Sequence, residues 1–134
     1  MIGIDTNVLV RFLVQDDPEQ SAEASAIFAG LTEEAPGFLP REVMVELVWV
    51  LERAYRLPRR DIADAIDGLL SSREILVEAA DRVGLASQRY RMGGAGFSDQ
   101  MIALTARDAG CARILSFDRK AVASAGMSAP APRA

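Results

Sequence analysis

Short apolar runs alternate along this chain with longer segments of helical periodicity, and proline, glycine or helix-capping residues separate most of them. The apolar runs cover residues 2–4, 36–40, 75–77 and 113–116. Short runs that alternate with helical segments are typical of a parallel sheet whose two faces are covered by helices. The sequence therefore predicts an α/β fold with one such sheet.

The segments between these runs carry apolar residues at helical spacing and begin at capping residues or prolines. The segment 41–55 differs from the others because it is apolar almost all round, so we expect it to be the most buried helix. The predicted helices cover about residues 8–13, 19–31, 41–55, 59–70, 79–90 and 99–109.

The length of 134 residues fits a single domain, and half of the residues are apolar, which is enough for one core. We expect one domain over residues 1–128 and a disordered tail over 129–134, where proline alternates with alanine.

The single Cys111 excludes an internal disulfide. No apolar run is long enough to cross a bilayer, and the first residues do not resemble a signal peptide, so the sequence predicts a cytoplasmic protein. The balance of 15 basic and 19 acidic residues argues against a strongly basic face for nucleic acid.

Four acidic residues lie far apart in a chain that contains no histidine. Asp5 and Asp118 end predicted strands, Asp99 lies in the first turn of a predicted helix, and Glu46 lies within the segment 41–55. Because ligands bind at the carboxyl ends of parallel strands, we expect all four side chains to point into one crevice there. Carboxylates without imidazole favour a hard divalent cation over acid–base catalysis by histidine. As structural alternatives, Asp5 and Asp118 suit helix caps, and Asp99 suits the helix dipole.

Glu46 is harder to explain by structure alone. The alternative for it is a narrow polar strip with Glu42 and Arg53 on the same helix. A carboxylate among bulky apolar neighbours is costly unless a cation or a donor compensates it, and a metal would supply that compensation.

Four blocks of the chain, taken together, are specific for a known family. They are residues 4–11 (IDTNVLVR), 39–51 (LPREVMVELVWVL), 97–103 (FSDQMIA) and 114–119 (ILSFDR). In this order they resemble the PIN domain family, and in particular the VapC-type ribonuclease toxins of bacterial toxin–antitoxin pairs. The resemblance covers nearly the whole chain.

The resemblance implies a three-layer α/β/α fold with a central, mostly parallel sheet of four to five strands. It also implies an endoribonuclease that hydrolyses RNA phosphodiester bonds with Mg²⁺ or Mn²⁺. By this resemblance Asp5 and Asp99 are the main metal ligands, and Glu46 and Asp118 complete the catalytic acids. Supporting hydrogen bonds would come from hydroxyl and amide side chains of the same blocks, Thr6, Asn7 and Ser116.

The implied partners are an RNA substrate, a cognate antitoxin protein and a second copy of the chain in a homodimer. We expect the antitoxin to lie in an apolar groove around Val10, Leu13 and Leu31 and to place a cation beside the acids. Candidates for contacts with RNA phosphates, each with solvated surface charge as the alternative, are Arg11, Arg89 and Arg91.

Two positions depart from the family pattern. Gly96 stands where many members carry a further acid, and the segment 125–128 has few of the β-branched residues expected of a last edge strand. A competing interpretation is a catalytically inactive PIN-like binding or regulatory module, which the loss of one of the four acids would indicate; none is lost. A third is a Rossmann-like phosphoryl-transfer domain, which needs paired acids and a lysine near the pocket, whereas the only lysine is Lys120.

Overall fold

Three short strands form a parallel sheet in the order β1-β2-β3. The computed structural model describes residues 1–130, so most of the predicted disordered tail at 129–134 lies outside the described residues. The strands are β1 (Ile2–Gly3), β2 (Gly37–Leu39) and β3 (Ile75–Val77), with Ile2 opposite Gly37 and Phe38 opposite Leu76. The helices are α1 (Thr6–Val14), α2 (Pro18–Ala29), α3 (Arg41–Arg53), α4 (Arg59–Ser71), α5 (Ala80–Arg91), α6 (Phe97–Asp108) and α7 (Arg119–Ser124).

These elements confirm the α/β class, and their ends differ from the predicted ones by only a few residues. Proline accounts for several of the boundaries: Pro36 and Pro40 flank β2, and Pro58 stands directly before α4. Within residues 1–130, α7 is the one helix that the periodicity did not predict. None of the helices within residues 1–130 has the length and apolar content that crossing a membrane requires.

The run 113–116 does not join the sheet, so the expected four to five strands are not confirmed within the described residues. It pairs with the segment after α7 through one parallel bridge between Leu115 and Ser128. The Ser116 N–H donates to the Ser128 carbonyl over 2.9 Å, and the Ser128 N–H donates to the Ile114 carbonyl over 2.7 Å. The two segments on either side of α7 thus form backbone hydrogen bonds with each other and not with the sheet. Within residues 1–130, the outer edge of β1 therefore has no neighbouring strand.

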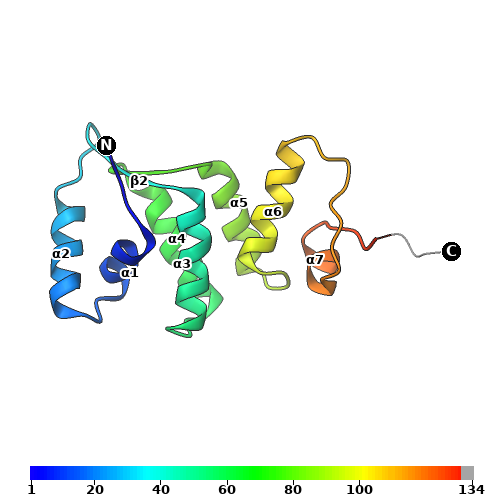
Figure 1. Ribbon diagram of the computed structural model, residues 1–134, viewed down its shortest axis with the longest axis horizontal. Helices are drawn as coiled ribbons and strands as arrows, with labels where there is room; N and C mark the ends of the chain where they lie inside the picture. The colour runs from blue at the N-terminus through cyan, green and yellow to red at the C-terminus, as the bar shows by residue number, and fades with distance from the viewer. Residues whose placement is uncertain (131–134) are drawn as a thin grey trace.

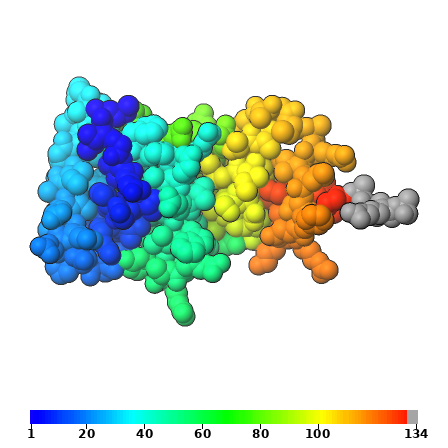
Figure 2. Space-filling view, in the orientation of Figure 1, coloured from blue at the N-terminus to red at the C-terminus, as the bar shows by residue number. Residues whose placement is uncertain are grey.

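The helices stand side by side in a row that leads from α2 at one end to α7 at the other (Figure 1). α3, α4 and α5 occupy the middle of this row, and α6 lies between them and α7. The space-filling view shows the same elongated outline, with the carboxyl-terminal part at the opposite end from α1 and α2 (Figure 2). The segment 113–118 is therefore separated from β1 by the width of the central helices.

In the described part of the chain the core consists of two clusters. The larger one joins the sheet to α1, α3, α4, α5 and α6 and contains large buried side chains such as Leu39, Leu47, Ile66, Tyr90 and Leu104. The smaller one lies against α7 and is built mainly of alanine, with Ala95, Ala103, Ala121, Ala125 and Met127. A fully buried leucine contributes about 1.5–3 kcal/mol, and alanine has much less apolar area to bury. α7 is therefore held more weakly than the central helices.

α3 is not buried all round, in contrast to the prediction. Its buried face is formed by Val43, Met44, Leu47, Val48 and Leu51. Trp49 is 59% exposed, and the Glu46 side chain is also exposed, because only one face of the helix packs against the core while another borders a cleft. The desolvation cost predicted for Glu46 does not arise in this arrangement.

Candidate functional site

A cleft of about 670 Å³ opens between α1, α2 and α3. Its wall includes Asp5 and Glu46, and its apolar part includes Val10, Ile27 and Val50. Two of the four predicted acids, which are 41 positions apart in the sequence, therefore share one concave surface.

Asp5 stands where the chain leaves β1 and enters α1. The Ile4 N–H still bonds to the Phe38 carbonyl over 3.0 Å, so the chain follows β2 up to that residue. Asp5 is then the N-cap of α1, and its Oδ1 accepts from the Thr6 N–H over 2.7 Å. The carboxylate lies at the carboxyl edge of the strand, at the positive end of a helix dipole, with its side chain exposed.

Thr6 connects this strand end to the middle of α3. Its side chain is 7% exposed, and its hydroxyl donates to Glu46 Oε1 over 3.3 Å. Asn7 follows on the wall of the same cleft. The two predicted supporting residues of the first block thus lie beside both acids of the cleft, and Thr6 contacts one of them directly.

Asp99 lies at the start of α6 and does not line this cleft. The helix begins at Phe97 with Gly96 as its N-cap, and Asp99 Oδ2 accepts from the Gly96 N–H over 3.3 Å. Its side chain is half-buried. Gly96, the position that departs from the family pattern, is therefore the residue whose backbone holds the Asp99 carboxylate.

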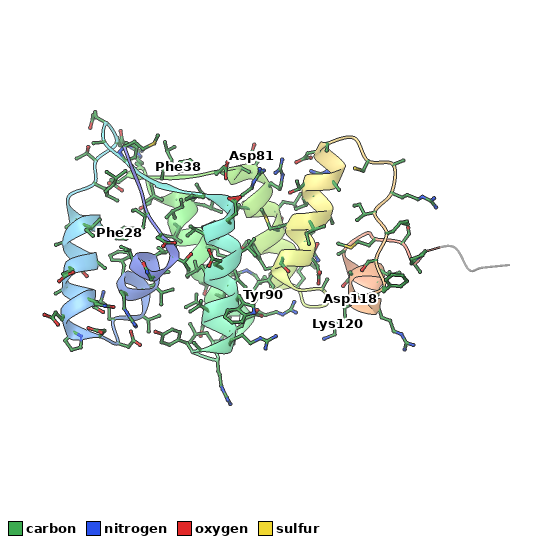
Figure 3. The ribbon with its side chains drawn as sticks, in the orientation of Figure 1. Phe28, Phe38, Asp81, Tyr90, Asp118 and Lys120 are labelled. Atoms are coloured by element: carbon green, nitrogen blue, oxygen red, sulfur yellow. The ribbon has the colours of Figure 1, made fainter. Side chains whose placement is uncertain are left out.

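Asp118 is the N-cap of α7, and its Oδ1 accepts from the N–H groups of Lys120 at 2.8 Å and Ala121 at 3.3 Å. Ser116 supports this turn, because its hydroxyl oxygen accepts from the Asp118 N–H over 3.0 Å. Figure 3 shows Asp118 and Lys120 beyond α6, on the side away from α1 and α3. The structure therefore keeps Asp118 apart from Asp5.

The four acids do not form one cluster here, and no three histidine, cysteine, aspartate or glutamate side chains within residues 1–130 lie close enough together to hold a metal ion. The expected crevice required residues 113–116 to lie in the sheet, and they do not. The capping roles considered as alternatives for Asp5 and Asp118 are both present, and Asp99 also binds a backbone N–H at a helix start. The polar strip considered for Glu46 does not use Arg53 as an ionic partner, since that guanidinium lies over the Trp49 ring at 5.7 Å.

The donors at the cleft fit Mg²⁺ or Mn²⁺ by their chemistry. Asp5 and Glu46 offer carboxylate oxygens, and Asn7 adds an amide oxygen on the same wall. Hard divalent cations take oxygen ligands, and Mg²⁺ keeps several of its waters when one or two protein carboxylates bind it. The cleft therefore supplies part of a ligand set for such a cation.

A second polar group on the cleft was not visible in the sequence. The Arg11 guanidinium donates to Asp16 Oδ1 over 2.9 Å, to Gln20 over 2.8 Å and to the Tyr55 hydroxyl oxygen over 3.2 Å. Tyr55 in turn donates to Asp16 Oδ2 over 2.7 Å, and this hydrogen bond is the largest cause of the lowered pKa of Asp16 and the raised pKa of Tyr55. Gln15, in the left-handed region at φ 60°, makes the turn that brings Asp16 back to Arg11. The sequence pattern did not predict this turn.

Two of the arginines considered for RNA contacts are paired within the protein. Arg11 binds Asp16, and Arg91 binds Asp64 at 2.8 Å and Asp67 at 2.9 Å. These pairs offset the positive charge that a phosphate would meet.

The predicted apolar groove is divided between two surfaces. Val10 lines the cleft with the acids, whereas Leu13 and Leu31 line a separate hollow that includes Phe12 and Phe28. The rings of Phe12 and Phe28 stack at 4.0 Å and fix α1 against α2. A ligand that covers the acids would therefore meet Val10 but not Leu13 or Leu31.

Comparison with known proteins gives two matches. The family model described as PIN domain matches residues 2–126, a range that includes all four predicted acids. A protein of Aquifex aeolicus (strain VF5) named VapC ribonuclease is 29% identical over 118 residues, which make up 87% of this chain and 87% of that protein.

Proposed function

The chain belongs to the PIN domain family, and from that premise we propose that it is a divalent-metal-dependent endoribonuclease that acts as the toxin of a toxin–antitoxin pair. One observation carries the proposal: Asp5 and Glu46, from the end of β1 and the middle of α3, line one cleft, and the Thr6 hydroxyl links the two elements. The similarity to a protein named VapC ribonuclease supports RNA as the substrate.

In this proposal Asp5 and Asp99 are the main metal ligands, and Glu46 and Asp118 complete the catalytic acids. When bound, Mg²⁺ or Mn²⁺ would activate water and shield the charge that develops on the phosphate. The protein's own part is orientation. The Thr6 N–H holds Asp5, the Thr6 hydroxyl holds Glu46, and the Gly96 N–H holds Asp99. Asn7 has a supporting role on the cleft wall, and Ser116 has one beside Asp118.

Asp118 can take part only if the segment 113–118 moves to the free edge of β1. Three exposed apolar side chains support such a movement: Ile2 on β1 is 51% exposed, Leu115 is 52% exposed and Phe117 is 93% exposed. Pairing between the two segments would cover apolar surface that now faces water. The segment is held at present by a single bridge and a small alanine cluster, so little packing opposes the change.

The proposed partners follow from the same cleft. An antitoxin segment with apolar side chains for Val10, Ile27 and Val50 and a basic side chain for the acids would match its wall, and the chain's net charge of −4 favours a basic partner. The proposal includes a homodimer and action in the cytoplasm, as expected from the resemblance.

The test is cleavage of RNA by the purified protein with Mg²⁺ or Mn²⁺ and with excess chelator. We expect cleavage only with the cation, and no cleavage by Asp5→Asn or Glu46→Gln. Glu42→Gln is the matched control, because Glu42 is an exposed acid one turn earlier on α3 and lies outside the cleft wall. Cleavage that persists in chelator, or equal loss of activity in the Glu42 and Glu46 variants, would refute the proposal.

A second candidate is a binding module without catalysis. It is favoured because Asp99 does not line the cleft and Asp118 lies beyond α6. It predicts that RNA or the antitoxin binds while the RNA remains intact under every metal condition. A gel-shift measurement beside the cleavage assay separates the two candidates.

A further inference from the structure

One guanidinium holds the loop that leads into α6. Arg59 Nη1 donates to the carbonyls of Tyr90 at 3.0 Å and Ala95 at 3.2 Å, and Nη2 donates to the carbonyl of Gly94 at 2.8 Å. These three carbonyls lie at the end of α5 and in the loop before Gly96. A single side chain from the first position of α4 thus makes one hydrogen bond to the end of α5 and two to the loop.

The bond to the Ala95 carbonyl acts on the same peptide group that binds Asp99. The Ala95 carbonyl accepts from Arg59, and the N–H of that peptide, which belongs to Gly96, donates to Asp99 Oδ2 over 3.3 Å. The peptide is planar and trans, so its carbonyl and its N–H point in opposite directions. Fixing the carbonyl on one side therefore fixes the direction of the N–H on the other.

Arg59 is itself held in place. Its guanidinium lies 4.6 Å from the centre of the Tyr90 ring, and that ring is fully buried. The Tyr90 hydroxyl donates to Glu52 Oε2 over 2.8 Å, which ties the ring to the end of α3. The next residue, Arg60, has a side chain that is 79% exposed, so two adjacent arginines have entirely different surroundings.

We propose that Arg59 is a positioning residue for Asp99, which acts through the Ala95–Gly96 peptide and thereby raises the affinity of the protein for a divalent cation. This inference rests on the proposed function, because it takes Asp99 as a metal ligand. Groups that orient a metal ligand typically change metal affinity by about 10–100-fold when they are removed.

The competing explanation is that Arg59 only stabilises the fold, and Arg82 provides the matched control for it. Arg82 donates to Asp108 Oδ2 over 2.9 Å and to the Thr105 hydroxyl over 3.3 Å, with 18% of its side chain exposed. It therefore ties α5 to the other end of the same helix, α6, without touching the loop before Gly96. Loss of either arginine costs stability, but only Arg59 is connected to Asp99.

The experiment compares wild type with Arg59→Met, Arg59→Lys and Arg82→Met in the full chain. Mn²⁺ affinity is measured by calorimetric titration, and exchange of the Gly96 amide proton is measured by NMR without metal. We expect Arg59→Met to weaken Mn²⁺ binding by at least about tenfold relative to Arg82→Met, and to exchange the Gly96 proton faster. Arg59→Lys, which keeps the charge but not the fork of donors, should lie between wild type and Arg59→Met in both measurements.

Equal Mn²⁺ affinity in Arg59→Met and Arg82→Met, or an unchanged Gly96 exchange rate in both Arg59 variants, would overturn the inference. If Arg59→Met does not fold, the comparison of Arg59→Lys with Arg82→Met gives the same decision. If wild type binds no Mn²⁺, the proposed function fails, whereas the exchange rates still decide whether Arg59 fixes this peptide.

Discussion

The hydroxyl of Thr6 donates to Glu46 Oε1 over 3.3 Å and so joins the first turn of α1 to the middle of α3. The two residues are 40 positions apart in the sequence. The bond crosses the cleft wall that also carries Asp5, and it places a buried donor against an exposed carboxylate. Thr6 is therefore suited to orient Glu46 without being a ligand itself.

Replacing Thr6 by valine should separate this role from folding. Valine has nearly the same shape but lacks the hydroxyl, so Glu46 loses its donor, and we expect RNA cleavage to fall by about tenfold or more. The free energy of unfolding should change by less than about 1.5 kcal/mol, the usual range for one hydrogen bond. Thr6→Ser keeps the hydroxyl and should retain most of the activity. Full activity in Thr6→Val beside an inactive Glu46→Gln would show that the bond has no functional role.

Comparing stability with and without metal should show whether Glu46 is a metal ligand or a residue that destabilises the metal-free fold. Because its side chain is exposed, we expect Glu46→Gln to change the stability of the metal-free protein by only about 0.5 kcal/mol in either direction. Added Mn²⁺ at a hundredfold excess over its dissociation constant should stabilise wild type by about 2.7 kcal/mol and the variant by less. Thermal melts of both proteins with and without Mn²⁺ measure this. An equal metal-induced shift in the two proteins would remove Glu46 from the ligand set.

Two substitutions at Asp118 separate a helix cap from a catalytic acid. Asparagine keeps the capping oxygen and loses the charge, whereas alanine loses both. If Asp118 joins the other acids when the segment 113–118 moves, both variants should lose RNA cleavage, and only Asp118→Ala should also lose about 0.5–2 kcal/mol of stability. Activity is measured by cleavage and stability by denaturant unfolding. An active Asp118→Asn would limit Asp118 to the capping role that the structure shows.

The group of Arg11, Asp16 and Tyr55 predicts a pH dependence of stability. The Tyr55 hydroxyl, and after it Arg11, lowers the pKa of Asp16 from its ordinary value of 3.8 in the folded protein. Such a group stabilises the fold above that ordinary value, and the stabilisation is lost as the pH falls through the lower folded-state pKa. We therefore expect Asp16→Asn to melt at a lower temperature than wild type near neutral pH, with a difference that shrinks below pH 3.8.

Thermal melts across this pH range check the effect, and Tyr55→Phe provides the second variant. It removes the largest cause of the lowered pKa of Asp16, so the folded-state pKa of Asp16 should be higher in this variant than in wild type. The stabilisation that ionised Asp16 provides should therefore be smaller and should be lost at a higher pH. A difference between wild type and Asp16→Asn that stays constant down to the lowest pH would contradict the assigned pKa shift.

The local elements of this protein were determined by the sequence itself. Prolines at positions 36, 40 and 58 and the cap at Asp5 act on their immediate neighbours, so the ends of β2, α3, α4 and α1 lie close to where the pattern predicts them. The four blocks that resemble the family are likewise a property of the residues alone, and the family match over residues 2–126 confirms them.

The tertiary structure decided which of these elements meet. The residues of an apolar run such as 113–116 do not specify which strand it pairs with. Here its backbone forms hydrogen bonds with Ser128 and not with β1. This pairing separates Asp118 from Asp5. In the same way only packing distinguishes the half-buried Arg59 from the exposed Arg60. Helix capping and the effect of proline act over a few residues and can be predicted from sequence, whereas strand pairing, burial and hydrogen bonds such as that of Thr6 with Glu46 depend on residues far apart in the chain.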